Sequence, residues 1–151
     1  MFIHGRTNKV YYSVREKINY YKNVINKKIN VSAEIRRKAP LRLKTLNKIN
    51  NQTYDEPTLI VTDDKRFGNP ISKPRLCVAY KTDSKNRVIV RPLNKRTTES
   101  IILNNNINRQ IDKKYRAIDK SDIYENKYVL NENGSLVKLD KKDIKKIKSM
   151  Y

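Results

Sequence analysis

The stretch that decides the fold is Pro57–Leu103, PTLIVTDDKRFGNPISKPRLCVAYKTDSKNRVIVRPLNKRTTESIIL. It contains three runs rich in apolar and β-branched residues, which are typical of strands: Leu59–Thr62, Leu76–Tyr80 and Arg87–Val90. Between the last two runs, Asp83–Asn86 predicts a hairpin turn, because Asp and Asn side chains bond their own backbone and tolerate turn geometry. Further short strands are expected in Thr98–Leu103, Tyr115–Ile118 and Lys127–Leu130.

Helical patterns lie on both sides of this strand-rich stretch. Ser13–Glu16 forms a capping box, and the apolar spacing that follows it predicts a helix over about 13–29. Ser32 predicts the start of a second helix. Pro40 predicts a break or kink in that helix, because proline cannot donate a hydrogen bond to the preceding turn. Asp140 predicts the N-cap of a last helix.

These patterns predict an α+β chain that forms one compact unit. A basic helical extension of two or three short helices, residues 1–56, precedes the strand-rich part, residues 57–151. Four tyrosines of the extension are expected to pack between helices and sheet rather than to stack on bases: Tyr11, Tyr12, Tyr20 and Tyr21.

The chain carries a large excess of positive charge. It has 35 Lys and Arg against 15 Asp and Glu, a net charge of +20 and a pI of about 10.1. Such an excess indicates an anionic partner, and nucleic acid comes first because each neutralised phosphate releases condensed counterions. The chain is also rich in Lys, Asn and Ile, as an AT-rich coding bias would make it. A solvated surface without a partner is therefore the alternative for part of this charge.

The residue counts disfavour several classes of site. Cys77 is the only cysteine and His4 the only histidine, which excludes an intrachain disulfide and argues against zinc sites and histidine catalysis. Asp63–Asp64 suggests a divalent cation, but with no third acidic residue nearby a turn or helix-cap role is favoured. No metal and no cofactor are therefore expected. No segment approaches the roughly 18 apolar residues of a membrane span, and no signal peptide is recognisable, so a cytoplasmic protein is expected.

Cations, amides and hydroxyls gather beside the predicted strand ends. The first cluster, in the loop Asp64–Arg75, offers cations for phosphate and one ring for base stacking: Lys65, Arg66, Lys73, Arg75 and Phe67. The second cluster, Arg91–Thr98, offers more cations, one amide and two hydroxyls: Arg91, Lys95, Arg96, Asn94, Thr97 and Thr98. Meeting at one edge of a sheet, the two clusters would suit an RNA phosphodiester, because an arginine fork binds two phosphate oxygens and Asn or Thr orients the scissile group. The alternative is that they are solvated strand ends.

Four sequence motifs, taken in order, resemble a known family. Lys73–Ala79, KPRLCVA, is similar to a Lys-x-Arg-Pro element with the proline and arginine exchanged. Val88–Asn94, VIVRPLN, is similar to a strand that ends in Pro-Leu/Ile-Thr-Ser. Arg116–Ile123 and Leu136–Ile147 are similar to an Asp-Lys-Ser-Arg-Leu segment and a closing helix. Residues 57–147 thus resemble the MazF/PemK toxins (Kid and CcdB-like) and the related ToxN and AbiQ, which implies a small SH3-like β-barrel with a C-terminal helix. The N-terminal helical extension, residues 1–56, lies outside the family pattern and would cover the barrel, bind more nucleic acid or contact a protein partner.

The resemblance also implies a function. It implies a metal-independent endoribonuclease of a phage, plasmid or bacterial toxin–antitoxin system, which cuts single-stranded RNA by attack of the 2′-hydroxyl and leaves a cyclic phosphate. By this resemblance Arg75 would stabilise or protonate the phosphate. Asn94 takes the place of the family hydroxyl, so Thr97 or Thr98 would have to relay the proton. The implied partners are an antitoxin, either protein or RNA, and a second copy in a homodimer.

Two other interpretations stay open. Asn94 favours a catalytically inactive module that binds nucleic acid or a nucleoprotein, such as a phage-encoded inhibitor of a host defence complex. A structural or ribosome-associated basic protein would need neither a concave site nor Arg75.

Overall fold

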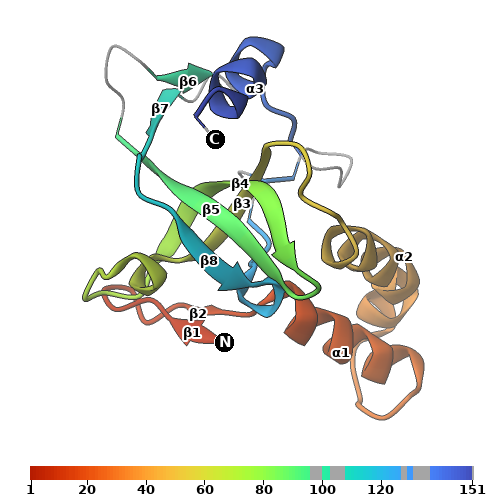
Figure 1. Cartoon of the computed structure of the whole chain (residues 1–151). Helices are drawn as coiled ribbons and strands as arrows, with labels where there is room; N and C mark the ends of the chain where they lie inside the picture. Colours follow the sequence, from red (N-terminus) through yellow and green to blue (C-terminus); the bar gives the residue numbers. More distant parts are fainter. Residues whose placement is uncertain (96–99, 103–107, 127–128, 131–136, 151) are drawn as a thin grey trace.

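The computed structural model describes residues 1–95, 100–102, 108–126, 129–130 and 137–150. Within these ranges the chain is α+β, as the sequence predicts, and combines three helices with a six-stranded antiparallel sheet (Figure 1). The sheet consists of β3 (Thr58–Asp63), β4 (Pro74–Ser84), β5 (Arg87–Asn94), β6 (Ile101–Ile102), β7 (Asn108–Ile111) and β8 (Arg116–Asp119). The order is β3-β4-β5-β7-β6, with β8 also paired to β5. Among these described strands, no pairing closes the sheet into a barrel.

Five of the six predicted strands have counterparts in the described part of the structure, but Lys127–Leu130 does not, because Val129 is a turn residue and Leu130 forms only a bridge. β3, β4 and β5 cover the three apolar runs, and the hairpin between β4 and β5 turns at Lys85 and Asn86. β6 lies within the predicted Thr98–Leu103, and β8 overlaps the predicted Tyr115–Ile118. β7 was not predicted, because its sequence, Asn-Arg-Gln-Ile, has no apolar alternation. Residues 127 and 128 of the remaining predicted strand lie outside the described residues.

Alternating residues of the central strands enter two hydrophobic cores on opposite faces of the sheet, as the two-residue period of a strand requires. Leu59 and Val61 of β3 belong to a core that also contains Ile147 of the C-terminal helix. Ile60, between them, belongs to a second core shared with Leu46 of the helical extension. The extension is therefore packed against the sheet, and its helices cover one face.

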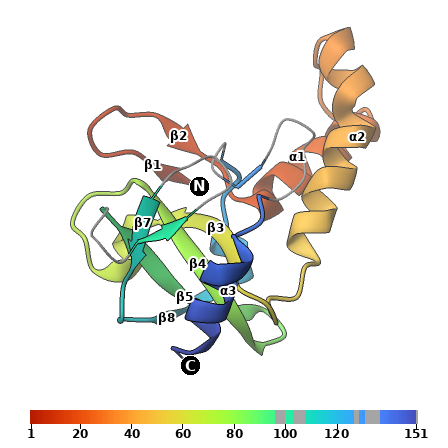
Figure 2. The ribbon, with the colours of Figure 1, turned by 90° about the horizontal axis from the view of Figure 1, so that it is seen from above.

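The helices begin where the capping residues predict. α1 (Val14–Ile25) has the capping box of Ser13 and Glu16, and α3 (Lys141–Lys148) is capped by Asp140. α2 (Ala33–Asn50) is capped by Ser32 and continues through Pro40, so the predicted break is wrong. Pro40 is exposed and has no N–H to donate to the carbonyl of Arg36, so α2 continues without this one hydrogen bond. α1 and α2 lie side by side, away from α3 (Figure 2). Within the described residues, none of the helices combines the length and apolarity that crossing a bilayer requires.

The first residues of the chain form a hairpin of β1 (Phe2–Ile3) and β2 (Val10–Tyr11) that docks on the loop before β4. The ring of Phe2 stacks on Tyr11 at 4.9 Å between centroids and meets Tyr124 edge-on at 4.7 Å. The backbone N–H of Gly5 donates to the carbonyl of Ser72 at 3.0 Å. A Cβ at Gly5 would lie 2.7 Å from Cγ2 of Ile71, so glycine permits this close approach. Residues 1–11 thereby become a wall next to the strand ends.

Replacing Pro40 with alanine is expected to stabilise the protein, because alanine restores the missing helix hydrogen bond at an exposed site. The gain in unfolding free energy should be about 2 kcal/mol, after allowing for the freedom that alanine adds to the unfolded chain. Urea denaturation of the wild type and Pro40→Ala measures it. Leu41→Ala, at the next position and 70% exposed, is the control and should stay within about 0.5 kcal/mol of wild type. A Pro40→Ala protein that unfolds at lower urea would contradict this account of α2.

Candidate functional site

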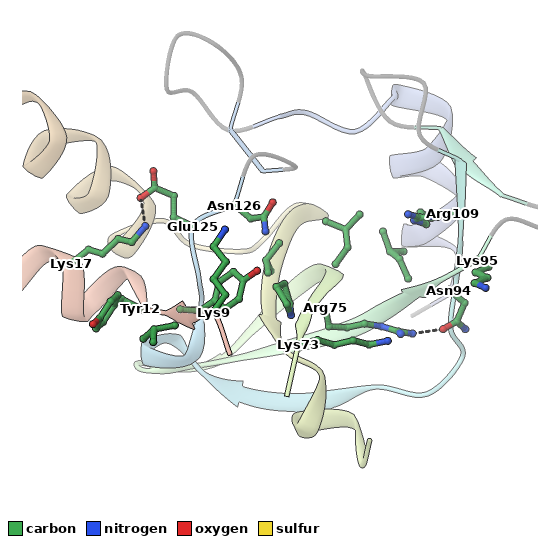
Figure 3. A pocket seen from close by; sticks show the side chains of 16 residues that line it. Lys9, Tyr12, Lys17, Lys73, Arg75, Asn94, Lys95, Arg109, Glu125 and Asn126 are labelled. Carbon is green, nitrogen blue, oxygen red and sulfur yellow. Dashed lines mark hydrogen bonds and ion pairs between the residues drawn. The ribbon is translucent and has the colours of Figure 1, made fainter. Parts of the chain in front are cut away.

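A cavity of about 870 Å³ lies between the N-terminal hairpin and the ends of β4 and β5 (Figure 3). Its lining comes from β2, α1, β3, β4, β5, β7 and the segment after β8. Six cations line it: Lys9, Lys17, Lys73, Arg75, Lys95 and Arg109. Of the described lining residues, Glu125 alone carries a negative side chain. The cavity is therefore strongly cationic.

Arg75 and Asn94 meet in this cavity because of the register of the sheet. Cys77 pairs with Pro92 in the antiparallel ladder of β4 and β5, and continuing this register by two residues sets Arg75 opposite Asn94. Nη2 of Arg75 donates to Oδ1 of Asn94, and Nη1 lies 3.6 Å from Oδ1 of Asp64. The side chain of Arg75 is 21% exposed. The two predicted clusters are thus joined at the Arg75–Asn94 contact.

Asp112 fixes the orientation of the Asn94 carboxamide. Nδ2 of Asn94 donates to Oδ2 of Asp112 at 3.1 Å, which turns the Oδ1 atom of Asn94 toward Arg75. The other oxygen of Asp112 accepts the backbone N–H of Lys114 at 2.9 Å. That backbone hydrogen bond is the main cause that lowers the pKa of Asp112, and the Asn94 amide and the charges of Lys114 and Arg75 add to it. Asp112 is therefore ionised at neutral pH.

Asp64 anchors the opposite side of Arg75. Its residue is 1% exposed, and its Oδ1 atom accepts from Nδ2 of Asn69 at 2.6 Å. Its Oδ2 atom lies 3.7 Å from Nζ of Lys73. The preceding Asp63 caps the 3-10 helix η1 (Asp64–Phe67) by accepting from the N–H of Lys65, which confirms the predicted cap role. Within the described ranges, no group of three His, Cys, Asp or Glu side chains is arranged to hold a metal ion.

Three other predicted residues of the first cluster, Lys65, Arg66 and Phe67, lie outside the cavity lining. Lys65 is exposed on η1, and Arg66 is paired with Asp122 at 2.9 Å. Phe67 is half-buried and packs against the second hydrophobic core, so its ring is partly used by the fold. Lys73 does line the cavity. The first cluster therefore divides into a cavity part, Lys73 and Arg75, and a part on the outer surface.

Arg91, a predicted phosphate contact, is a structural residue. Its residue is 8% exposed, and its guanidinium donates to the carbonyls of Lys113 at 2.9 Å and Met150 at 3.3 Å. The same group lies over the rings of Tyr80 and Tyr115, at 5.3 and 6.0 Å from their centroids. A buried guanidinium held by carbonyls and rings is not open to a phosphate, so Arg91 is removed from the candidate site.

Of the second cluster, Asn94 and Lys95 line the cavity. Arg96, Thr97 and Thr98 lie outside the described residues, so the expected proton relay by a threonine stays a prediction. Asn94 also borders a smaller cavity of about 490 Å³ between β7 and α3. The carboxamide of Asn94 thus lies where the two cavities adjoin.

The sequence did not identify the wall that the N-terminal region adds. Lys9, Tyr12 and Lys17 line the cavity, yet their sequence neighbourhood reads only as a diffuse basic face. Across the cavity, Arg109 belongs to the unpredicted strand β7. Nothing local in the sequence signals these contacts, because they arise from docking of segments far apart in the chain.

The tyrosines of the extension behave differently from one another. Tyr11 and Tyr21 pack against the cores, as expected. Tyr20 is 40% exposed and meets Tyr21 edge-on at 5.0 Å. Tyr12 is 49% exposed and borders the cavity, so the packing role expected for it is wrong. The residue follows β2, where the chain leaves the sheet before Ser13 caps α1.

Comparisons with protein-family models, with curated proteins and with solved structures find no match to this chain. The functional argument therefore rests on the geometry of the cavity.

Asp112→Asn is expected to lower the unfolding free energy at neutral pH, because it replaces one of the two accepting oxygens with an NH2 group that cannot accept from Asn94 or Lys114. A carboxyl group whose pKa falls on folding stabilises the fold above its ordinary pKa of 3.8, and this contribution is lost as the pH falls through the folded value. The difference between wild type and Asp112→Asn should therefore shrink below pH 3.8. Urea denaturation at several pH values measures it.

Asp119→Asn is the matched control, since Asp119 also accepts a backbone N–H two residues on and has a lowered pKa. The Nδ2 resonances of Asn94 in a ¹H–¹⁵N spectrum should shift in Asp112→Asn and stay in place in Asp119→Asn. Unchanged Asn94 resonances in Asp112→Asn would show that Asp112 does not orient the carboxamide.

Proposed function

We propose that this protein binds single-stranded RNA in the cationic cavity. The observation that carries the proposal is the set of six cations around one cavity: Lys9 on the N-terminal wall, Lys17 on α1, Arg109 on β7, and Lys73, Arg75 and Lys95 at the ends of β4 and β5. Converging Lys and Arg side chains attract the phosphates of a nucleic acid chain. A volume of about 870 Å³ lies in the range of ligand pockets and suits a few linked nucleotides rather than a duplex.

Glu125, the one acidic residue of the described lining, does not cancel the positive charge of the cavity. Nη2 of Arg42 lies 2.7 Å from both carboxylate oxygens of Glu125, and Nζ of Lys17 lies 3.4 Å from Oε2. Glu125 is therefore neutralised by two cations from the helical extension. Lys9, Lys73 and Lys95 are exposed, so their ammonium groups can reach a ligand.

The MazF/PemK-like barrel and the toxin–antitoxin role are part of the proposal. Support for them comes from the order of the four sequence motifs and from the antiparallel pairs β4-β5 and β5-β8, whose strands carry the first three motifs. An antitoxin, a second copy of the chain or a host nucleoprotein are the partners that this proposal would bring.

RNA cleavage is the second candidate function, and the contact between Arg75 and Asn94 favours it. In that reaction the 2′-oxygen bonds to phosphorus while the bond from phosphorus to the 5′-oxygen breaks. The 2′-hydroxyl proton passes to a base, and the leaving oxygen takes up a proton. Arg75 would stabilise the charge on the pentavalent phosphorus centre. The described lining offers no free carboxylate as the base, since Glu125 is paired, and for this reason binding is the primary proposal.

Lys73→Ala is expected to weaken RNA binding and to lower its salt dependence. For single strands, the slope of log K against log salt concentration should become shallower by about 0.7 for each lost phosphate contact. Fluorescence anisotropy with a labelled single-stranded RNA at several salt concentrations gives the slope. Lys44→Ala, an exposed lysine on α2 outside the cavity lining, should keep the wild-type slope. Equal slopes for all three proteins would exclude the cavity as the RNA site.

If the site also cuts RNA, Arg75→Ala should lose cleavage of single-stranded RNA by about 100-fold or more, as expected for removal of a group that stabilises transition-state charge. Cleavage should persist in EDTA, leave a 2′,3′-cyclic phosphate and be absent on 2′-O-methyl RNA. Gel analysis of end-labelled RNA measures all three. Wild type that binds but leaves RNA intact would restrict the function to binding, and equal cutting by Arg75→Ala would place the activity elsewhere.

A further inference from the structure

Tyr12 presents an aromatic ring that the fold leaves unused. Every other tyrosine that the structure describes has a ring or cation partner: Tyr11, Tyr20, Tyr21, Tyr54, Tyr80, Tyr115 and Tyr124. Among the described residues no such partner is found for Tyr12, and 49% of it is exposed. Tyrosine buries a large apolar surface when it packs, so an open ring at a cavity wall is available to a ligand.

The chain direction of the hairpin explains why this ring points away from the core. Along an extended segment side chains alternate, and Tyr11 is the residue that turns inward against Phe2. All three residues Val10, Tyr11 and Tyr12 line the cavity, but Val10 and Tyr12 are the exposed ones, at 39% and 49%. Together they give the N-terminal wall an apolar and aromatic surface.

Cations surround this aromatic wall. In Figure 3, Tyr12, Lys9 and Lys17 lie toward one end of the cavity and Asn94 and Lys95 toward the other, with Lys73 and Arg75 between them. A flat apolar surface beside a row of cations is complementary to a strand whose bases and phosphates alternate. Bases stack on aromatic side chains regardless of sequence, because every base has a π-face.

We propose that Tyr12 is a base-stacking subsite, on which one unpaired base of the RNA rests while phosphates further along the strand contact Lys73 and Arg75. The inference rests on the proposed RNA binding and adds to it a requirement for an unpaired base. It also assigns a role to the N-terminal wall, which supplies the stacking surface that the strand ends lack. A polyanion without bases would use the cations alone.

The test compares two ligands and four proteins by fluorescence anisotropy. One ligand is a labelled 2′-O-methyl oligouridine of about ten nucleotides, within the range of single-strand site sizes, and the other is an abasic oligonucleotide of the same length. The methyl groups prevent cleavage, so the readout is binding only. The proteins are wild type, Tyr12→Ala, Tyr12→Phe and Tyr20→Ala. Tyr20→Ala removes another exposed tyrosine of the extension, one that does not line the cavity.

Tyr12→Ala is expected to lose at least about five-fold in affinity for the oligouridine, as a stacked base requires, and to bind the abasic strand as wild type does. Tyr12→Phe keeps the ring and Tyr20→Ala keeps the subsite, so both should bind the oligouridine like wild type. An equal loss on both ligands, or no loss on either, would overturn the stacking subsite while RNA binding in the cavity stands. Wild type that binds neither ligand would overturn the proposed function itself. Circular dichroism verifies that each variant is folded.

Discussion

The ion pairs of Asp64 are the interaction on which the candidate site depends. A carboxylate that is almost fully buried is costly unless its charge is compensated and its oxygens accept hydrogen bonds. Here Asn69 donates to it, and Lys73 and Arg75 supply the opposite charge from the strand that follows. The backbone N–H of Asp64 also donates to the carbonyl of Lys73 at 2.8 Å, which ties the start of η1 to the start of β4. Arg75 is therefore held in place before any ligand arrives.

A second carboxylate completes this arrangement from the other strand. Asp112 accepts from Asn94, and Asn94 in turn accepts from Arg75, which pairs with Asp64. A chain of polar contacts thus runs from Asp112 to the buried Asp64. The guanidinium still faces a cavity with more cations than acids, because these two carboxylates lie behind it rather than in the lining. Preorganised charge of this kind loses little in reorganisation when an anion binds.

Much of the fold follows from local sequence, whereas the partners in the site follow from two irregularities in the sheet. The strands β3, β4 and β5 were predictable because their apolar runs are β-branched and separated by turn residues. Counted from the turn at Lys85 and Asn86 without interruption, the hairpin register would set Arg75 opposite Arg96. Register shifts between Ala79 and Lys81 and between Thr82 and Ser84 move the partner by two residues, to Asn94. A shift of two keeps each side chain on its face, so no hydrophobic pattern reveals it.

Long-range docking was equally hidden from sequence reasoning. Arg91 directly follows the correctly predicted strand run Arg87–Val90, yet its buried structural role depends on Tyr115 and Met150, which are distant in the chain. The aromatic contacts of Phe2 with Tyr11 and Tyr124 likewise cannot be read from spacing. The α+β class was therefore within reach of the sequence, while the composition of the cavity was not.

The N-terminal hairpin contacts the rest of the molecule through the ring of Phe2, which meets Tyr124, and through the hydrogen bond from Gly5 to Ser72. A ligand that contacts both this hairpin and β4 would hold the hairpin in its docked position. By linkage, ligand binding would stabilise the docked hairpin. The amide hydrogens of residues 2–11 would then exchange more slowly with solvent. Docking of the hairpin and binding of the ligand would thus be coupled in one equilibrium.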